Sequence, residues 1–310
     1  MLQPKRASLI VLNYNGQDVI GACVDSLLAA MGPDDELIVV DNASVDGSRA
    51  ILDTFGERVR QVRLDENTFI FGLNEGLAQA RGRVVAFLNN DMTVDPGFVD
   101  TCVGLLETGG PDVFAVCPRI VQDDGVDQGS RTAGFWSRGL LFYEPLPHTD
   151  EVTDCFFAVG GQSFFDRAKL LEIGSIDPLL RPMYHEDIEL SYRAWKRGWR
   201  IVYAPTAVAR HRGGHTSKKV FTARQLRSFV RQNELLIVWK NVTSRRLMAQ
   251  HVFWLPLRLL TAAMRRDWAT IDGFRAAWGR RGLLAEARIG ASRHARITDE
   301  DVLRRVSAIH

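Results

Sequence analysis

Two patterns of apolar and polar residues take turns along the first 110 residues of the chain. Short, almost continuous apolar runs have the length and composition of buried strands, and they lie at residues 7–12, 36–40, 59–64 and 84–88. Between these runs, apolar residues recur every three or four positions, which predicts helices over residues 18–30, 44–55, 73–80 and 96–106. Strands that alternate with helices in this way predict an α/β fold, with a mostly parallel central sheet and helices on both faces.

Polar residues directly follow three of the predicted strands. They form the clusters Asn13-Tyr14-Asn15-Gly16, Asp41-Asn42-Ala43-Ser44 and Asn89-Asn90-Asp91. Ligands of such sheets bind outside the carboxyl ends of the strands. Asn and Asp also cap helices and form turns, so one cluster alone would be ambiguous. Three clusters at the same edge favour a binding crevice.

The predicted crevice is rich in oxygen atoms and lacks a glycine cradle for phosphate. Neither G-x-x-x-x-G-K-[ST] nor G-x-G-x-x-G follows the first strand. Carboxylate and amide oxygens suit hard cations such as Mg²⁺ or Mn²⁺. We therefore expect a divalent ion to hold a diphosphate here, with the carboxylate of Asp91 meeting the metal-bound diphosphate.

The middle of the chain carries weaker patterns. Residues 124–152 predict a long loop region, and residues 166–173 predict a short helix. The next dense stretch places His185, Glu186, Asp187 and Glu189 at the start of a helix that runs to about residue 197, followed by a strand over residues 199–203. Acidic residues at a helix start also suit the helix dipole, so this cluster has a structural explanation beside a catalytic one.

The chain changes character after residue 219. Helices are predicted over residues 225–240 and 246–265, and residues 241–310 carry 13 Arg and no Lys against six acidic residues, in a chain whose net charge is +2. Basic helices with aromatic residues can lie in a membrane interface, pack on the rest of the chain, or join two copies in a homo-oligomer. No nucleic-acid-binding motif accompanies the charge, so no nucleic-acid partner is expected.

The cysteines and the N-terminal residues indicate the cellular compartment of the protein. The four Cys show no C-x-x-C spacing and lie among apolar residues, which predicts buried free thiols in a reducing compartment. The apolar run near the N-terminus is too short for a signal peptide, and no uncharged stretch reaches the roughly 18 residues of a membrane span. We expect a cytoplasmic protein, with peripheral membrane contact through residues 241–310 as one use of the basic helices.

Five ordered motifs resemble those of the family 2 glycosyltransferases with the GT-A fold, especially the rhamnosyltransferase-like branch. They read "IVLNYNG", "VVDNASVDGS", "LNEGLAQARGRVVAFLNND", "GGQSFFDR" and "HEDIELSYRAWKRGWRIVYAP", and the likeness covers residues 8–217. The resemblance implies a GT-A catalytic domain over residues 1–218, with a nucleotide-sugar-binding half to about residue 120 and an acceptor-binding half after it. Residues 219–310 would form an α-helical extension.

The resemblance also implies roles for individual residues. Asp187 would be the catalytic base, with Glu186 placing the acceptor or holding Asp187. Asp91 would be the main metal ligand and His211 a further one, with His215 as an alternative. The remaining implied contacts are Gly160 and Gly161 at the acceptor, and Asn13, Asn15, Asp41, Asn42, Asn74, Asn89, Asn90 and Asp91 at the nucleotide sugar.

The implied reaction is inverting, metal-dependent transfer of one sugar from a dTDP- or UDP-type donor, with rhamnose favoured. The acceptor would be a saccharide or a polyprenyl-linked precursor in cell-envelope glycan assembly. The segment ENTFIFGLNEG and the segment IDPLLRPMYH depart from the family pattern, and the Q-x-x-R-W signature of processive synthases is absent. Two other functions stay open: a nucleotidyltransferase, which would need a Gly-rich basic loop after the first strand, and a non-catalytic binding scaffold.

Overall fold

The computed structural model describes residues 5–122, 125–211 and 220–309 and divides the chain into two compact units. The first unit comprises Met1–Arg131, Pro145–Ile176 and Arg200–Gly214, and the second comprises Thr132–Glu144, Asp177–Trp199 and His215–His310. These units group residues by contact, so the domain boundary expected after residue 218 stays a prediction.

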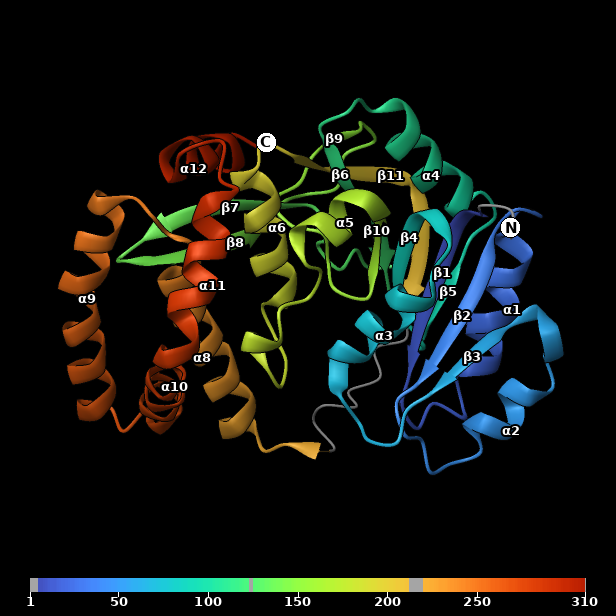
Figure 1. Cartoon of the computed structure of the whole chain (residues 1–310), viewed down its shortest axis with the longest axis horizontal. Coiled ribbons are helices and arrows are strands. Elements are labelled where there is room, and N and C mark those ends of the chain that lie inside the picture. The colour runs from blue at the N-terminus through green and yellow to red at the C-terminus, as the bar shows by residue number, and fades with distance from the viewer. Residues whose placement is uncertain (1–4, 123–124, 212–219, 310) are drawn as a thin grey trace. The chain divides into compact units, whose positions relative to one another are not determined.

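The first unit is built on a single mixed sheet (Figure 1). Its strands follow the order β3-β2-β1-β4-β10-β6-β11-β5, with β9 paired to β11. The four strands from β3 to β4 run parallel, as do β6 and β11, whereas β5, β9 and β10 pair antiparallel. The bounds are β1 Lys5–Asn13, β2 Glu36–Asp41, β3 Arg60–Arg63, β4 Gly82–Asn89, β5 Met92–Val94, β6 Val113–Val121, β9 Thr153–Asp154, β10 Gln162–Asp166 and β11 Arg200–His211.

Helices cover both faces of this sheet, as the alternation of strands and helices predicts. Leu9 and Val11 of β1 pack into a core with α1 and α4, whereas Ile10 on the other face meets α3, where Gly76 allows close approach. The helices of this unit are α1 Ile20–Ala30, α2 Ser48–Asp53, α3 Gly72–Gln79, α4 Phe98–Thr108 and α5 Arg167–Ile173, with 3-10 turns η1 Gly56–Arg58 and η2 Phe69–Phe71. The α/β fold class is therefore confirmed.

The long loop expected over residues 124–152 is wrong for its central part. Residues 132–145 form the hairpin β7 Thr132–Ser137 and β8 Leu140–Pro145, and all of it up to Glu144 belongs to the second unit. Its two-residue turn has positive φ angles at Arg138 (45°) and Gly139 (79°), the backbone of a hairpin turn that matches strand twist. The strand expected over residues 199–203 is also longer, because β11 continues past a register shift to His211.

The second unit is mainly helical. Its helices are α6 Glu186–Lys196, α8 Ala223–Asn241, α9 Arg245–Met264, α10 Trp268–Gly279, α11 Arg281–Arg293 and α12 Asp299–Ser307, with the 3-10 turn η3 Pro178–Leu180. The two helices predicted over residues 225–240 and 246–265 are confirmed. Helices α10 and α11 pack on α8, and no helix in the described part of the chain is long and apolar enough to cross a membrane.

A buried ion-pair network ties α6 to α8 within this unit. Glu189 is fully buried, and its carboxylate lies 2.8 Å from Arg193 and 2.6 Å from Lys240, which also pairs with Asp177. Burial alone would raise the pKa of Glu189, but the positive charges of Arg193 and Lys240 lower it to about 2. This acid of the predicted cluster is therefore used to hold α6 in place.

Candidate functional site

The three polar clusters predicted from the sequence do meet at one edge of the sheet. Asn13 at the end of β1 is in register with Asp41 at the end of β2, and Leu12 is in register with Asn89 at the end of β4. Because β2, β1 and β4 are neighbours, their polar carboxyl ends lie side by side. The expectation of a single polar edge is confirmed.

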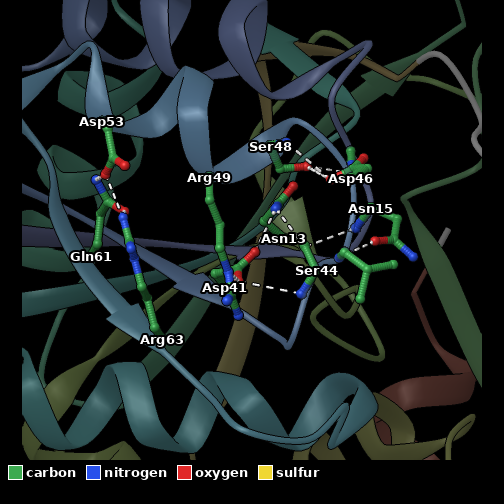
Figure 2. A network of polar contacts seen from close by, with 12 residues as sticks. Asn13, Asn15, Asp41, Ser44, Asp46, Ser48, Arg49, Asp53, Gln61 and Arg63 are labelled. Carbon is green, nitrogen blue, oxygen red and sulfur yellow. Dashed lines mark hydrogen bonds and ion pairs between the residues drawn. The ribbon is translucent and has the colours of Figure 1, made fainter.

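Asn13 is the centre of the hydrogen bonds at this edge (Figure 2). Its buried amide donates to Asp41 Oδ1 and to Ser44 Oγ, both at 3.1 Å, and its Oδ1 accepts from Asn90 Nδ2 at 2.7 Å. A Cβ atom on Gly16 would lie 2.1 Å from Asn90 Nδ2, so Gly16 keeps space for that side chain. The side chain of Asn13 thus links the ends of all three strands.

Asp41 is fully buried, and neighbours engage its carboxylate. Arg49 Nε lies 2.6 Å from Asp41 Oδ2, and the backbone N–H of Ser44 donates to the same oxygen at 3.3 Å. The Arg49 side chain is 39% exposed, so the arginine of this ion pair reaches solvent whereas the buried Asp41 does not. A contact of Asp41 with the nucleotide stays a prediction, and no pattern in the sequence pointed to Arg49.

Hydrogen bonds between the loops after β1 and β2 lock these two loops together. Ser44 Oγ accepts from the backbone N–H of Asn15, whose own Oδ1 accepts from Val45 N at 2.9 Å. Asp46 accepts from Gln17 N and from Ser48, and burial, which would raise its pKa, is outweighed by these hydrogen bonds, which lower it. The loops therefore form one ordered rim, with Asn15 exposed on it.

Asn42 and Asn74 make contacts of a different kind. Asn42 uses its whole amide group on Asn67, Thr68 and Phe69, and so holds the segment before α3. Asn74 Nδ2 donates to the carbonyl of Ile176 at 2.9 Å, while its buried Oδ1 has no hydrogen-bond partner among the described residues. Their roles at a nucleotide sugar stay predictions, and for Asn42 the contacts are those of a structural clamp.

The structure brings the two predicted metal ligands together. His211 Nε2 lies 3.1 Å from Asp91 Oδ1, with both side chains largely buried. His211 Nδ1 lies 3.0 Å from Gln128 Oε1. In the tautomer that carries its hydrogen on Nδ1, His211 would donate to Gln128 and its Nε2 lone pair would be available to a cation. Metal-binding histidines usually make a hydrogen bond through their other ring nitrogen, and the contact of Nδ1 with Gln128 matches that arrangement.

The pair fits a divalent cation as part of a larger ligand set. Two atoms that bind one Mg²⁺ at about 2.1 Å and at right angles lie about 3 Å apart, close to the observed spacing. No group of three or more His, Cys, Asp or Glu side chains that could hold a metal occurs in the described residues. A substrate and water would be natural sources of further ligands. His215 lies outside the described residues.

Gly161 lies against Asn89 at the end of β4. The backbone N–H of Asn89 donates to the Gly161 carbonyl at 2.6 Å, and a Cβ atom on Gly161 would lie 2.1 Å from Asn89 Oδ1. With a φ angle of +74°, this position is suited to glycine on both grounds. Gly160 precedes it, and an acceptor role for either glycine stays a prediction.

Within the second unit, α6 begins with two neighbouring acids, Glu186 and Asp187, and the protein environment shifts the pKa of the first. Glu186 is half-buried, and burial of its carboxylate together with the nearby charge of Asp187 raises its pKa to about 8. Its Oε2 has no hydrogen-bond partner in the described part of the chain. The raised pKa favours the neutral form of Glu186 at pH 7.

The charge of Asp187 acts on two further residues, Tyr143, which sequence reasoning missed, and His185, which it named without a role. Burial raises the pKa of Tyr143 and the charge of Asp187 raises it further. Burial lowers the pKa of His185, although Asp187 opposes the change, and His185 has a φ angle of 62°. Both line a small cavity of about 90 Å³ with Ile188. Tyr143 lies in the hairpin that the sequence did not predict, so no local signal could have found it.

Comparison with known proteins gives the family. The model of "Glycosyl transferase family 2" matches residues 8–174, more than half of the chain. The chain belongs to this family. A family 2 glycosyltransferase is an enzyme, and the matched segment contains the polar edge around Asn13, Asp41 and Asp91.

Individual relatives support the family and the fold. The chain is 41% identical over 88 residues to TuaG, a candidate teichuronic acid biosynthesis glycosyltransferase of Bacillus subtilis (strain 168), covering 27% of this chain and 35% of the relative. It spans about a third of the length of the curated relatives it matches first.

Two solved structures share the architecture of this family 2 glycosyltransferase. One is S. aureus TarS residues 1–349 in complex with UDP-GlcNAc, with a TM-score of 0.61, 17% identity and coverage of 97% of this chain and 90% of that chain. The other is GalNAc-T7 with UDP, GalNAc and Mn²⁺, with a TM-score of 0.63, 17% identity and coverage of 78% and 49%. At this identity the likeness concerns the fold, and the predicted GT-A fold is confirmed.

Proposed function

We propose that this family 2 glycosyltransferase transfers a single sugar, with inversion, from a nucleoside-diphosphate sugar to an acceptor hydroxyl in a reaction that needs Mn²⁺ or Mg²⁺. The observation that carries the proposal is the Asp91–His211 pair beside the ordered polar edge of the sheet. The edge supplies amide, carboxylate and backbone groups for a nucleotide, and the pair supplies two ligands for a cation.

Each donor-side residue has a proposed task. Asn13 and the exposed Asn15 flank the nucleotide base, and Asp41 with Arg49 borders the base or ribose. Asp91 and His211 hold the divalent cation, which when bound would neutralise charge that develops on the leaving diphosphate. Gln128 keeps the His211 ring in the tautomer that presents Nε2.

Asp187 is the proposed general base. The acceptor oxygen attacks the anomeric carbon from the face opposite the diphosphate, the bond from carbon to the diphosphate oxygen breaks, and Asp187 takes the acceptor proton. Support comes from the different environments of the two acids, because neighbouring carboxylates with separated pKa values usually have separate roles. Ionised Asp187 can accept a proton at pH 7, whereas neutral Glu186 can donate a hydrogen bond to the acceptor or to Asp187.

The substrate classes follow from the relatives and the sequence. A dTDP-rhamnose donor is favoured by the rhamnosyltransferase-like motifs. A UDP-type donor has support from the two solved structures with this fold, one of which contains UDP-GlcNAc and the other UDP with GalNAc. TuaG is named for teichuronic acid biosynthesis, so the proposed acceptor is a saccharide or polyprenyl-linked precursor of a cell-envelope glycan. Assembly of such a precursor places the enzyme on the cytoplasmic side.

We also propose peripheral membrane contact through residues 241–310. Support comes from the outward side of α9, where large apolar side chains are exposed: Val252, Phe253, Leu257, Leu260 and Met264. Vesicle flotation of the full chain tests this contact. The double variant Leu260→Ser and Met264→Ser should lose flotation, whereas Val152→Ser with Leu171→Ser, two similarly exposed residues of the first unit, should not. Equal flotation of both double variants would refute it.

The catalytic proposal is tested by release of the nucleoside diphosphate from UDP-GlcNAc, UDP-glucose and dTDP-rhamnose in the presence of Mn²⁺. An active transferase should show slow, metal-dependent release of UDP or dTDP even without an acceptor. Release of pyrophosphate from a nucleoside triphosphate and a sugar phosphate would instead indicate the nucleotidyltransferase. Binding of a donor without any turnover, with or without candidate acceptors, would support the scaffold.

A further inference from the structure

A cavity of about 300 Å³ lies inside the second unit, between the β7–β8 hairpin and helices α8, α9 and α10. It lies at the lower end of the usual size range for small-molecule sites. None of the residues proposed above to bind donor, metal or acceptor lines it. Its lining divides into a charged part and an apolar part, so its chemistry can be argued from each part separately.

The charged part is positive. Arg138, Arg231, Arg258 and Arg265 line the cavity together with two acids, Glu234 and Asp267, which leaves a formal excess of two positive charges. Arg231 pairs with Glu234 at 2.9 Å, whereas Arg258 and Arg265 form no ion pair with a carboxylate in the described part of the chain. The cavity therefore has cationic groups that are not matched by acids of its own.

The electrostatic environment of Arg258 agrees with this excess of positive charge. Burial lowers the pKa of the Arg258 guanidinium, and the charges of Arg231 and Arg138 lower it further, against the opposing effect of Glu234. The Arg258 head group is held in place, because it donates to the carbonyl of Arg138 at 3.0 Å and lies over the ring of Phe142. An anion in the cavity would relieve the repulsion between these arginines.

The apolar part continues onto the surface. Leu235, Trp254 and Phe274 line the cavity, and so does Leu257, which is 43% exposed on the outward side of α9. Through Leu257 the cavity adjoins the exposed apolar residues of that helix. A ligand with an anionic head and an apolar chain would satisfy both parts, whereas a bare anion would leave the apolar lining unused.

We propose that this cavity binds the phosphate-bearing end of an anionic amphiphile, such as an isoprenyl phosphate, with the phosphate near Arg258 and Arg265 and the chain along Leu257 and Trp254. The inference deepens the membrane contact proposed above and depends on it in part, because the exposed side of α9 would meet the lipid phase. It needs neither the sugar donor nor the metal.

The test is calorimetric binding of farnesyl phosphate, below its critical micelle concentration, to the full chain without donor or metal. Arg258→Gln and Arg265→Gln should each weaken binding about tenfold, the effect of losing one charge-assisted contact. Arg265 is exposed, so its variant should fold normally. The matched control is Arg246→Gln, an exposed arginine of α9 outside the cavity, and it should bind within about twofold of the parent.

Two other probes separate the parts of the ligand. Farnesol and inorganic phosphate should each bind at least about tenfold more weakly than farnesyl phosphate. The proposal is overturned if farnesol binds as well as farnesyl phosphate, if inorganic phosphate binds equally well, or if Arg246→Gln loses as much affinity as the cavity variants. Because sugar transfer, vesicle flotation and farnesyl phosphate binding are measured separately, failure of this inference is distinguishable from failure of the proposed function.

Discussion

His211 Nε2 lies 3.1 Å from Asp91 Oδ1, although 120 positions separate the two residues in the sequence. Asp91 directly precedes β5, and His211 at the end of β11 pairs with Met92 of that strand, while Gln128 contacts the imidazole from its other side. Neither residue could hold a cation alone, and the pair leaves further coordination positions for a substrate. This pairing is the basis of the proposed metal-dependent donor site.

Loss of either ligand should abolish the effect of the metal on donor binding. We expect Asp91→Asn and His211→Ala to bind a nucleoside-diphosphate sugar with the same affinity with and without Mn²⁺, measured by calorimetry, whereas the parent binds more tightly with Mn²⁺. Asp95→Asn is the matched control, because Asp95 pairs with Arg210 next to His211 and should keep the metal effect. Retention of the metal effect in both ligand variants would refute the assignment.

Asp187→Asn should separate catalysis from binding. The amide keeps the size of the side chain but cannot accept the acceptor proton, so turnover should fall by about 10²–10⁴-fold. Donor affinity, measured by calorimetry with Mn²⁺, should change less than about twofold. A loss of donor affinity comparable to the loss of turnover would instead assign Asp187 to donor binding.

Glu186→Gln should make stability less dependent on pH. The folded chain holds the Glu186 proton up to a pKa of about 8, above the ordinary value of 4.5, so the folded state binds more protons than the unfolded state between these values. The parent should therefore lose unfolding free energy relative to Glu186→Gln as pH rises from 5 to 7.5, by up to about 1.4 kcal/mol per pH unit.

Denaturant unfolding at several pH values measures this difference. Glu286→Gln serves as the control, because Glu286 is an exposed side chain of the same unit and its variant should follow the parent at each pH. Parallel curves for the parent and Glu186→Gln would show that Glu186 is ionised in the folded state.

Gly161→Ala should destabilise the chain and disturb Asn89. The added Cβ would meet Asn89 Oδ1 at 2.1 Å, in addition to the strain of a φ angle of +74°, so the cost should exceed the roughly 1–2 kcal/mol of left-handed strain alone. Gly97→Ala is the control, because Gly97 has a φ of +80° and a Cβ atom there would have nothing within 4 Å. Equal losses of melting temperature in the two variants would show that the contact with Asn89 is unimportant.

The polar edge could be predicted because local patterns determine it. Apolar runs that end in Asn13, Asp41 and Asn89 mark strands, and parallel order brings their ends together. The partners that hold the edge are long-range, as with Arg49 on Asp41 and Gln128 on His211, and single-sequence patterns carry no such information. Asn42 follows Asp41, and because successive residues of an extended chain point to opposite sides, it meets Asn67 and Thr68 instead.

The hairpin over residues 132–145 shows a different limit of prediction from the sequence. Its strands are short and its outward side carries exposed aromatic residues, so the run from Thr132 to Pro145 looks irregular until the turn at Arg138 and Gly139 is recognised. The pKa of Glu186 could not be predicted either, because it depends on burial by residues far away in the sequence. Local patterns therefore predicted the sheet edge better than the surroundings of α6.

The polar edge with Asp91 and His211 is, in our proposal, a metal-dependent nucleotide-sugar site. A thermal-shift panel of dTDP-, UDP- and GDP-sugars, each with and without Mn²⁺, tests it most directly. A donor at about 100 times its dissociation constant stabilises the folded state by roughly 2.7 kcal/mol, which gives a clear shift. We predict that one nucleotide class raises the melting temperature only with Mn²⁺. No shift with any donor in the presence of Mn²⁺ would contradict the proposal.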